Sequence, residues 1–173
     1  MIGAVALAHD SEIVDVGGGA STLVDKLLDR GFERLTVVDL AESSLNVAKA
    51  RLGPRADRVR WLKEDARGLH LPCPVDLWHD RAVFHFLTEP ADQEAYLSSM
   101  REAVRSGGHV IIATFGPQGP QQCSGLPVER YDAEKLSRRL GPEFRLLRSL
   151  EIMHITPWGS TQQFMYCLFR RTE

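Results

Sequence analysis

Three consecutive glycines follow a short apolar run near the start of the chain, and no other segment constrains the fold as strongly. The run covers residues 13–16 and contains one acid, Asp15. It leads directly into Gly17, Gly18 and Gly19. Because glycine has no Cβ, the backbone can turn sharply from a strand into a helix, and a ligand can approach the main chain closely. The segment therefore predicts either a nucleotide-type ligand site or a purely structural turn.

A second acid, Asp39, ends the next apolar run, 24 residues after Asp15. A carboxylate at the tip of a neighbouring strand can bind both hydroxyls of a ribose. Asp39 could instead cap the helix that follows it, or lie on the surface as a solvated acid. Ser43 or Ser44 offers another cap for that helix, which would leave Asp39 available for a ligand.

Short β-branched runs alternate with amphipathic patterns along the chain, which predicts parallel strands joined by helices in an α/β fold. The expected strands are residues 12–16, 35–39, 58–62, 75–79 and 109–115. The expected helices are residues 21–30, a helix from Ser43 or Ser44 to Arg51, residues 91–105 ending at Ser106-Gly107-Gly108, and residues 133–140.

The last third of the chain has a different pattern. Residues 116–120 contain two glycines and two prolines and predict a loop over the sheet. Two long strand-like runs follow at residues 144–155 and 162–171, and a turn at residues 156–160 joins them. This pattern predicts an antiparallel hairpin, unlike the repeated strand-helix unit that ends a dinucleotide dehydrogenase.

Composition excludes several classes of protein. The chain has 173 residues, which predicts a single domain over residues 1–173. With 21 Lys and Arg against 23 Asp and Glu, the charge balance indicates neither a nucleic-acid partner nor a membrane surface. Cys73, Cys123 and Cys167 form no CxxC pair, so we expect reduced thiols, no metal site and a cytoplasmic protein.

The combined motifs resemble those of the class I S-adenosylmethionine-dependent methyltransferases over residues 13–171. Residues 15–19 are similar to the acid-x-Gly-x-Gly loop of that family, and Asp39 is similar to the acid that ends its second strand. Residues 64–66 and 76–87 resemble the segments after its third and fourth strands. The resemblance implies a Rossmann-like three-layer sandwich with a seven-stranded, mostly parallel sheet, an antiparallel terminal hairpin and the strand order 3-2-1-4-5-7-6.

The resemblance also implies the cofactor S-adenosyl-L-methionine, with S-adenosyl-L-homocysteine as the product. Asp39 would bind the ribose, Leu40 the adenine face, and Asp65 the adenine amine. Asp15 would hold the glycine loop or, through water, the ligand's ammonium group. Asp65 could equally be a solvated acid within the charged run 63–65. The implied cofactor-binding residues are Asp15, Gly17, Gly18, Gly19, Asp39, Leu40, Asp65, Ala66 and Asp80.

Three residues near the end of the fourth strand are the candidate catalytic residues: Asp80, Arg81 and His85. Ligands bind at this edge of an open α/β sheet. His85 could accept a proton from an acceptor, or it could be a packed helix residue. Asp80 and Arg81 could instead form a structural salt bridge. Methyl transfer from a sulfonium is an in-line displacement with an activated donor, so a general base is not obligatory.

The methyl acceptor is expected to be a small molecule or a protein side chain. We place its selection in the loop of residues 116–130, and a second wall at the hairpin turn. Trp158 in that turn could also be a hydrophobic plug. The residues named for these walls are Cys123, Ser124, Leu126, Pro127, Tyr131, His154, Thr156, Pro157 and Trp158. The sequence has no Asn-Pro-Pro-aromatic motif, which argues against methylation of nucleic-acid amino groups.

Two other functions stay open. One is a nicotinamide-dependent reductase, although Thr22 stands where a dinucleotide fingerprint would have its third glycine. The other is a catalytically silent protein that binds S-adenosylmethionine. Only residues 1–10 precede the first strand, so we expect the amino-terminal lid helices to be short or absent. A second subunit could then complete the site in a homodimer.

Overall fold

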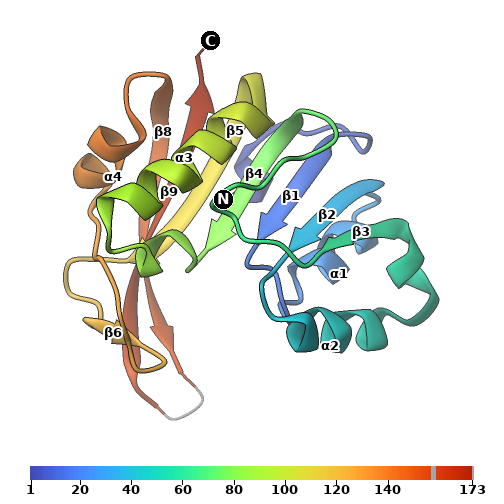
Figure 1. The fold of residues 1–173 in the computed structure, drawn as a ribbon, viewed down its shortest axis with the longest axis horizontal. Helices are drawn as coiled ribbons and strands as arrows, with labels where there is room; N and C mark the ends of the chain where they lie inside the picture. The colour runs from blue at the N-terminus through green and yellow to red at the C-terminus, as the bar shows by residue number, and fades with distance from the viewer. Residues whose placement is uncertain (157–158, 173) are drawn as a thin grey trace.

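The computed structural model describes residues 1–156 and 159–172, and its centre is a seven-stranded sheet with the order β3-β2-β1-β4-β5-β9-β8 (Figure 1). Five strands are parallel: β1 (Glu12–Val16), β2 (Arg34–Val38), β3 (Val59–Leu62), β4 (Val75–Arg81) and β5 (Val104–Phe115). The strands β9 (Thr161–Arg171) and β8 (Phe144–Ile155) are antiparallel. As β8 and β9 are the sixth and seventh strands of this sheet, the predicted order and terminal hairpin are confirmed.

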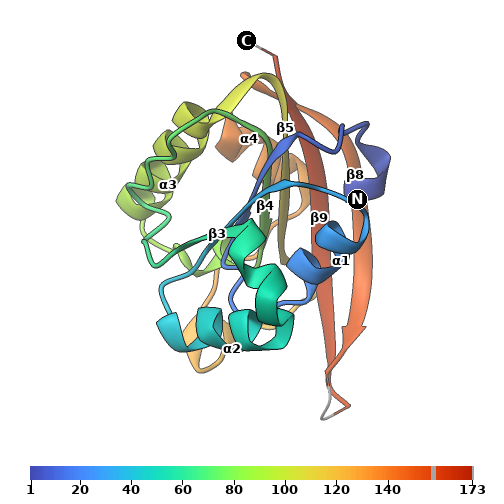
Figure 2. The same cartoon turned by 90° about the vertical axis from the view of Figure 1, so that its right-hand side faces the viewer.

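Helices cover the two faces of the sheet (Figure 2). The helices α1 (Leu23–Asp29) and α2 (Glu42–Leu52) pack on one face, whereas α3 (Pro90–Ala103) and α4 (Ala133–Leu140) pack on the other. Each face has its own apolar cluster, in which residues three or four apart along a helix point toward the strands. In α3 these residues are Tyr96, Leu97 and Met100, all fully buried. The predicted three-layer α/β sandwich is therefore confirmed.

The register of the sheet brings three strand ends together. Val16, the last residue of β1, pairs with Val38 on one side and with Asp80 on the other. Because parallel strands share a direction, the segments that follow β1, β2 and β4 leave the sheet at one edge. The glycine turn, Asp39 and Arg81 meet there, although they are far apart in the sequence.

Two predicted helix boundaries are wrong. Helix α2 starts at Glu42, and its N-cap residue is Ala41, so Ser43 and Ser44 lie inside the first turn and do not cap it. The Ala41 amide donates instead to Oδ1 of Asp39, at 2.8 Å.

The helix expected to reach residue 105 ends at Ala103, because Val104 already pairs with Val75 in the sheet. Glycines that were expected to stop the helix lie within β5, where Gly107 has a φ of +72°.

The sequence did not predict a small hairpin between β5 and α4. It consists of β6 (Gln122–Cys123) and β7 (Leu126–Pro127), which pair antiparallel. Its turn residues Ser124 and Gly125 both have a positive φ, of 51° and 79°. Strands of two residues are too short to show an alternating apolar pattern, so this hairpin left no signal in the sequence.

Three short 3₁₀ turns complete the described chain: Ile2–Ala4, Gly53–Arg58 and Phe84–Phe86. The first belongs to an amino-terminal segment whose apolar side chains pack on the α1 face of the sheet. Within residues 1–156 and 159–172, none of the helices has the length and apolar character needed to cross a membrane.

Candidate functional site

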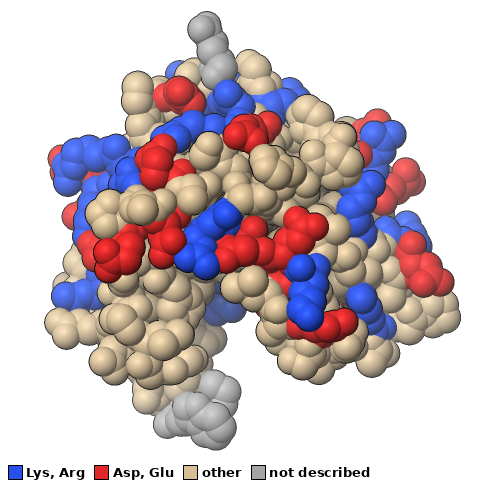
Figure 3. Space-filling model, in the orientation of Figure 1, with Lys and Arg blue, Asp and Glu red and all other residues tan. Residues whose placement is uncertain are grey.

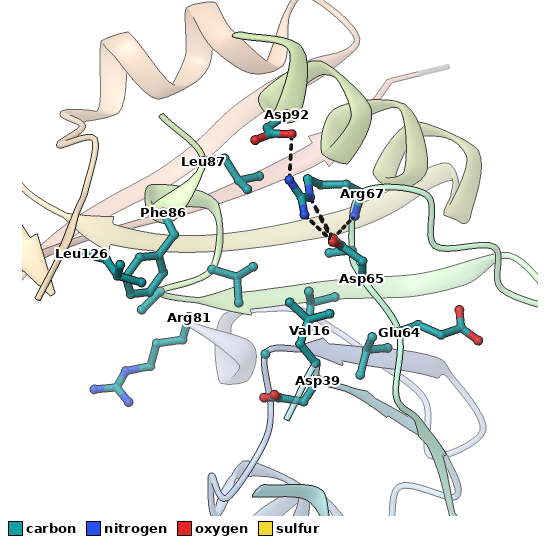
Figure 4. A pocket seen from close by; sticks show the side chains of 16 residues that line it. Val16, Asp39, Glu64, Asp65, Arg67, Arg81, Phe86, Leu87, Asp92 and Leu126 are labelled. Carbon is teal, nitrogen blue, oxygen red and sulfur yellow. Dashed lines mark hydrogen bonds and ion pairs between the residues drawn. The ribbon is translucent and has the colours of Figure 1, made fainter. Parts of the chain in front are cut away.

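A cavity of about 520 Å³ opens at the edge where β1, β2 and β4 end. Figure 3 shows this face hollowed between the uncharged surface over the β6–β7 hairpin and the part of the molecule that carries α2. Figure 4 shows the side chains that line the cavity. Six of the candidate cofactor-binding and catalytic residues are among them: Gly17, Asp39, Leu40, Asp65, Ala66 and Arg81.

The glycine turn is shaped by the close approach of neighbouring side chains. Gly17 has a φ of +68°, and a Cβ at this position would lie 2.1 Å from Cγ2 of Val83. A Cβ on Gly19 would lie 2.6 Å from Oδ2 of Asp39. The turn thus needs glycine for its own packing, while Gly17 also lines the cavity. The structural and ligand-binding interpretations of this segment are compatible with each other.

Asp15 does not line the cavity. It is buried within β1, and its Oδ1 lies 2.7 Å from Nδ1 of His79 on the adjacent strand β4. Oδ2 of Asp15 would lie only 2.7 Å from a Cβ on Gly18. Asp15 therefore lies directly under the glycine turn with His79 as its partner, and both roles expected for it stay predictions. The sequence did not predict this role of His79, because only the register of the strands brings it next to Asp15.

Asp39 lies at the end of β2 with its two carboxylate oxygens in different surroundings. Oδ1 accepts the bond from the Ala41 amide, whereas Oδ2 has no hydrogen-bond donor among the residues that the structure describes. The bond at Oδ1 orients the carboxylate, which leaves Oδ2 available to a hydroxyl of a ligand. The next residue, Leu40, is 64% exposed and lines the cavity, as an adenine contact would require.

Asp65 is part of a three-residue ionic cluster with Arg67 and Asp92. The Arg67 guanidinium donates to Oδ2 of Asp65 at 2.6 Å through Nη2, and to Oδ1 of Asp92 at 2.7 Å through Nη1. The hydrogen bond from Arg67 lowers the pKa of Asp65, so this carboxylate is ionised at neutral pH. Asp65 is therefore an ion-paired, partly exposed acid, and its contact with the adenine amine stays a prediction.

Arg67 and Asp92 are cavity residues that the sequence did not predict. Both line the cavity, and Asp92 comes from the first turn of α3. The signal in the sequence was a basic residue, Arg67, two positions after Asp65. Its second partner, Asp92, comes close only in the folded chain.

Asp80 is fully buried behind the cavity and does not line it. Its carboxylate accepts from the amides of Val83 and Phe84 at 2.8 and 3.0 Å, and from the Tyr96 hydroxyl at 2.6 Å. Burial raises the pKa of Asp80 to about 6 in spite of these donors. Asp80 forms no salt bridge with Arg81, so that alternative is wrong. Its position suits a residue that holds the turn beside Gly17, where Ala82 has a φ of +70°.

His85 is also fully buried and lies outside the cavity lining. Its Nδ1 accepts a hydrogen bond from the Phe115 amide at 3.2 Å, which assigns the proton of the neutral ring to Nε2. Burial lowers the pKa of His85 to about 4. The ring packs edge-on against Phe86 and Phe115. The structure thus supports the packing role for His85.

Residues expected to form the acceptor walls are divided between the cavity and the core. Leu126 of β7 lines the cavity. Tyr131 is buried in the core against Phe84, so its expected place in the acceptor wall is wrong. His154 packs edge-on near Phe164, and Thr156 accepts from the Ser160 amide. The expectations for Pro157 and Trp158 lie outside the described residues. Cys123 packs beside the small apolar cluster of Ala113, Phe115 and Phe164.

Comparison with known proteins identifies the family. The family model described as a methyltransferase domain matches residues 13–108. The chain belongs to this family. The malonyl-[acyl-carrier protein] O-methyltransferase of Anoxybacillus flavithermus is 30% identical over 157 residues, which are 87% of this chain and 57% of that protein. The chain spans about half the length of the curated relatives that it matches.

Solved structures of methyltransferases share the fold. The N-methyltransferase NodS from Bradyrhizobium japonicum, solved with S-adenosyl-L-homocysteine, has a TM-score of 0.74 at 17% identity, over 94% of this chain and 79% of that one. The Burkholderia thailandensis 1,6-didemethyltoxoflavin-N1-methyltransferase has a TM-score of 0.75 at 20% identity, over 95% of this chain and 72% of that one. The predicted S-adenosylmethionine-dependent methyltransferase fold is confirmed by these similarities.

Proposed function

We propose that this chain binds S-adenosyl-L-methionine in the cavity and transfers its methyl group to an acceptor that enters beside β7. One observation carries the proposal. The glycine turn after β1 and the Asp39 carboxylate after β2 face the same cavity, with Oδ2 of Asp39 still lacking a donor among the described residues. A bound nucleoside requires such a site, with a carboxylate for the two ribose hydroxyls and a neighbouring backbone that the ligand can approach closely.

The residues around the cavity fit the two ends of this cofactor. Asp39 would accept from the ribose hydroxyls, while Leu40 and Ala66 provide apolar contacts for the adenine. Asp65 would accept from the adenine amine and is held in place by Arg67. Gly17 would lie beneath the amino-acid end, since its backbone lines the cavity and has no side chain. When bound, the sulfonium supplies an already activated methyl group.

The protein's task in this reaction is alignment and exclusion of water rather than proton transfer. His85 packs in the core and has no contact with the cavity. Asp80 keeps the turn at Val83 in place through two backbone amides, so it acts as a positioning residue. Holding donor and acceptor in line is by itself a large source of rate acceleration.

We propose a small molecule or a protein side chain as the acceptor. The wall opposite the donor residues contains Phe86, Leu87 and Leu126, which are apolar. Whether a second subunit completes this wall in a homodimer stays a prediction.

Thermal unfolding with and without S-adenosyl-L-homocysteine tests the donor site, and NAD and NADP are tested separately as the alternative ligands. Saturating S-adenosyl-L-homocysteine should raise the midpoint of thermal unfolding, by the equivalent of about 3 kcal/mol at a hundredfold excess over Kd. The nicotinamide cofactors should produce no shift. Stabilisation by NADP alone would contradict the proposal and favour the reductase. Transfer of a labelled methyl group to an acceptor would then separate an enzyme from a silent binding protein.

A further inference from the structure

Arg81 is held at the cavity by two aromatic residues of another strand. It is the last residue of β4, and its Nε donates to the Tyr166 hydroxyl at 3.2 Å. Its guanidinium carbon lies 5.3 Å from the centre of the Phe164 ring. Both aromatic residues belong to β9, so the side chain is anchored on the antiparallel part of the sheet. These two contacts engage Nε and the face of the guanidinium. They leave Nη1 and Nη2 available for another partner.

No carboxylate in residues 1–156 or 159–172 forms an ion pair with Arg81. Arg67, the other arginine of the cavity lining, is engaged with Asp65 and Asp92. The remaining charged residues of the lining, Asp39 and Glu64, are acids. Arg81 is therefore the one cation of this lining without an ion-pair partner among the described residues.

The position of Arg81 separates it from the donor-binding residues. In Figure 4 Arg81 starts at the end of the cavity where Phe86 and Leu126 are found, but its exposed side chain extends away from these two residues as well as from Asp39 and Asp65. The cofactor residues occupy the opposite end. The part of the cavity left for the acceptor thus combines apolar walls with one cation.

A cation at this place has a physical consequence for the choice of acceptor. The methyl donor carries a positive sulfonium, so a second cation near it contributes a repulsive energy. An anion between the two charges lowers that energy. The paired Nη1 and Nη2 groups of an arginine match the two oxygens of a carboxylate, with parallel hydrogen bonds.

We propose that the acceptor is an apolar small molecule carrying a carboxylate, which binds Nη1 and Nη2 of Arg81 while the apolar part lies against Phe86 and Leu126. This inference rests on the proposed methyltransferase function. Arg81 is then the residue that selects the acceptor, and it takes no part in bond making. The cofactor's own carboxylate is a second source of the same chemistry, and the experiment separates the two.

The test uses the protein saturated with S-adenosyl-L-homocysteine and matched pairs of acids and their primary amides. The acids are benzoate, phenylacetate, 4-phenylbutyrate and octanoate, which differ in the size of the apolar part. Binding is followed by calorimetry and by chemical-shift changes of the arginine side-chain resonances. The tightest acid should bind about tenfold more tightly than its amide, as expected for a charge-assisted hydrogen-bonded pair.

Three variants make the result specific. Arg81→Gln should abolish the preference for the acid, and Arg81→Lys should retain only part of it, because lysine keeps the charge without the planar pair of donors. Arg148→Gln is the matched control, since it removes one positive charge from an exposed position of β8 outside the cavity lining. This control should retain the full preference. Each variant's thermal unfolding is measured, so that loss of folding is recognised.

Several outcomes would overturn the inference. It fails if none of the acids saturates the protein below about 10 mM, or if Arg81→Gln keeps the preference. It also fails if Arg81→Gln instead weakens the binding of S-adenosyl-L-homocysteine, because Arg81 would then bind the cofactor's carboxylate. In each of these cases the wild-type protein still binds S-adenosyl-L-homocysteine, so the proposed function stands. Absence of that binding would refute the proposed function itself.

Discussion

Val83 occupies the space in which a side chain on Gly17 would begin: its Cγ2 lies 2.1 Å from the position of a Cβ on that glycine. The two residues belong to different turns, since Gly17 follows β1 and Val83 follows β4. Val83 is kept in place by the bond from its amide to Asp80. The base of the cavity is thus made by two turns that fit against each other, and a change in one must be absorbed by the other.

Gly17→Ala should be strongly destabilising. A positive φ costs a residue with a Cβ about 1 to 2 kcal/mol, and the overlap with Val83 adds about 1 to 3 kcal/mol. Gly125→Ala is the matched control, because Gly125 has a φ of +79° but no atom within 4 Å of the added Cβ. Urea unfolding should therefore show the smaller loss for Gly125→Ala and the larger one for Gly17→Ala. Adding Val83→Ala to Gly17→Ala should restore part of the loss, and additive effects would show that the two side chains do not overlap.

Asp39→Ala should weaken the binding of S-adenosyl-L-homocysteine by about 1 to 3 kcal/mol, because the charge-assisted bonds to the ribose are lost. The same change removes the acceptor of the Ala41 amide at the start of α2. Asp39→Asn separates the two effects, since its carbonyl oxygen can still accept from Ala41 while the charge is absent. Titration calorimetry gives the affinity and urea unfolding gives the stability. Unchanged affinity in both variants would remove Asp39 from the cofactor site.

Arg67→Gln should affect ligand binding more than stability. Arg67 and its two partners are partly exposed, with 36% to 40% of each side chain accessible, and such ion pairs contribute less than about 1 kcal/mol to folding. Without Arg67, Asp65 loses its fixed position, so the affinity for S-adenosyl-L-homocysteine should fall about threefold to tenfold.

Arg55→Gln is the control for the loss of an exposed ion pair, here with Asp29 and away from the cavity. It should leave the affinity unchanged. Equal effects of Arg55→Gln and Arg67→Gln on binding would argue against a role for Arg67 in orienting Asp65.

Asp80 should make stability depend on pH in a definite direction. Burial raises its pKa from 3.8 to about 6, so between these values the folded chain holds a proton that the unfolded chain has released. Raising the pH through this range therefore favours unfolding, by about 3 kcal/mol at most.

The measurement compares the free energy of unfolding of the wild type with that of Asp80→Asn at several pH values from about 4 to about 7. The advantage of the wild type over the variant should shrink as the pH rises. Asp57→Asn, a change of an exposed acid, should show no such trend. A wild-type advantage that grows with pH would mean that the pKa of Asp80 is lowered in the folded protein.

The periodic parts of the fold were predictable from the sequence, because they follow from local patterns. Strand-like segments next to glycine or proline predicted the buried strands β1 and β2 and the paired strands β8 and β9. Helix α4 was predicted with its observed bounds, Ala133–Leu140, and its N-cap Asp132 accepts from the Lys135 amide. Asp39 was predictable for a similar reason, since it ends an apolar strand.

The parts that were missed depend on contacts between distant segments. Asp80 was a candidate catalytic acid in the sequence. In the fold it is buried, and the hydroxyl of Tyr96, 16 residues away, donates to its carboxylate. Arg67 was not singled out from the sequence, because only the approach of α3 supplies its second partner, Asp92. The early end of α3 arose in the same way, because pairing of Val104 with Val75 overrides the local stop signal of the glycines.

Leu126 is the one residue after Asp92 that lines the cavity within the described chain. All other lining residues come from the first 92 positions, while Leu126 sits on a two-strand hairpin inserted between β5 and α4. Leu126 is therefore encoded apart from the donor residues, whereas Phe86 and Leu87 of the same wall are encoded among them. Residues 116–130 can be randomised as a cassette to change this part of the wall, while the donor residues and the rest of the wall are left as they are.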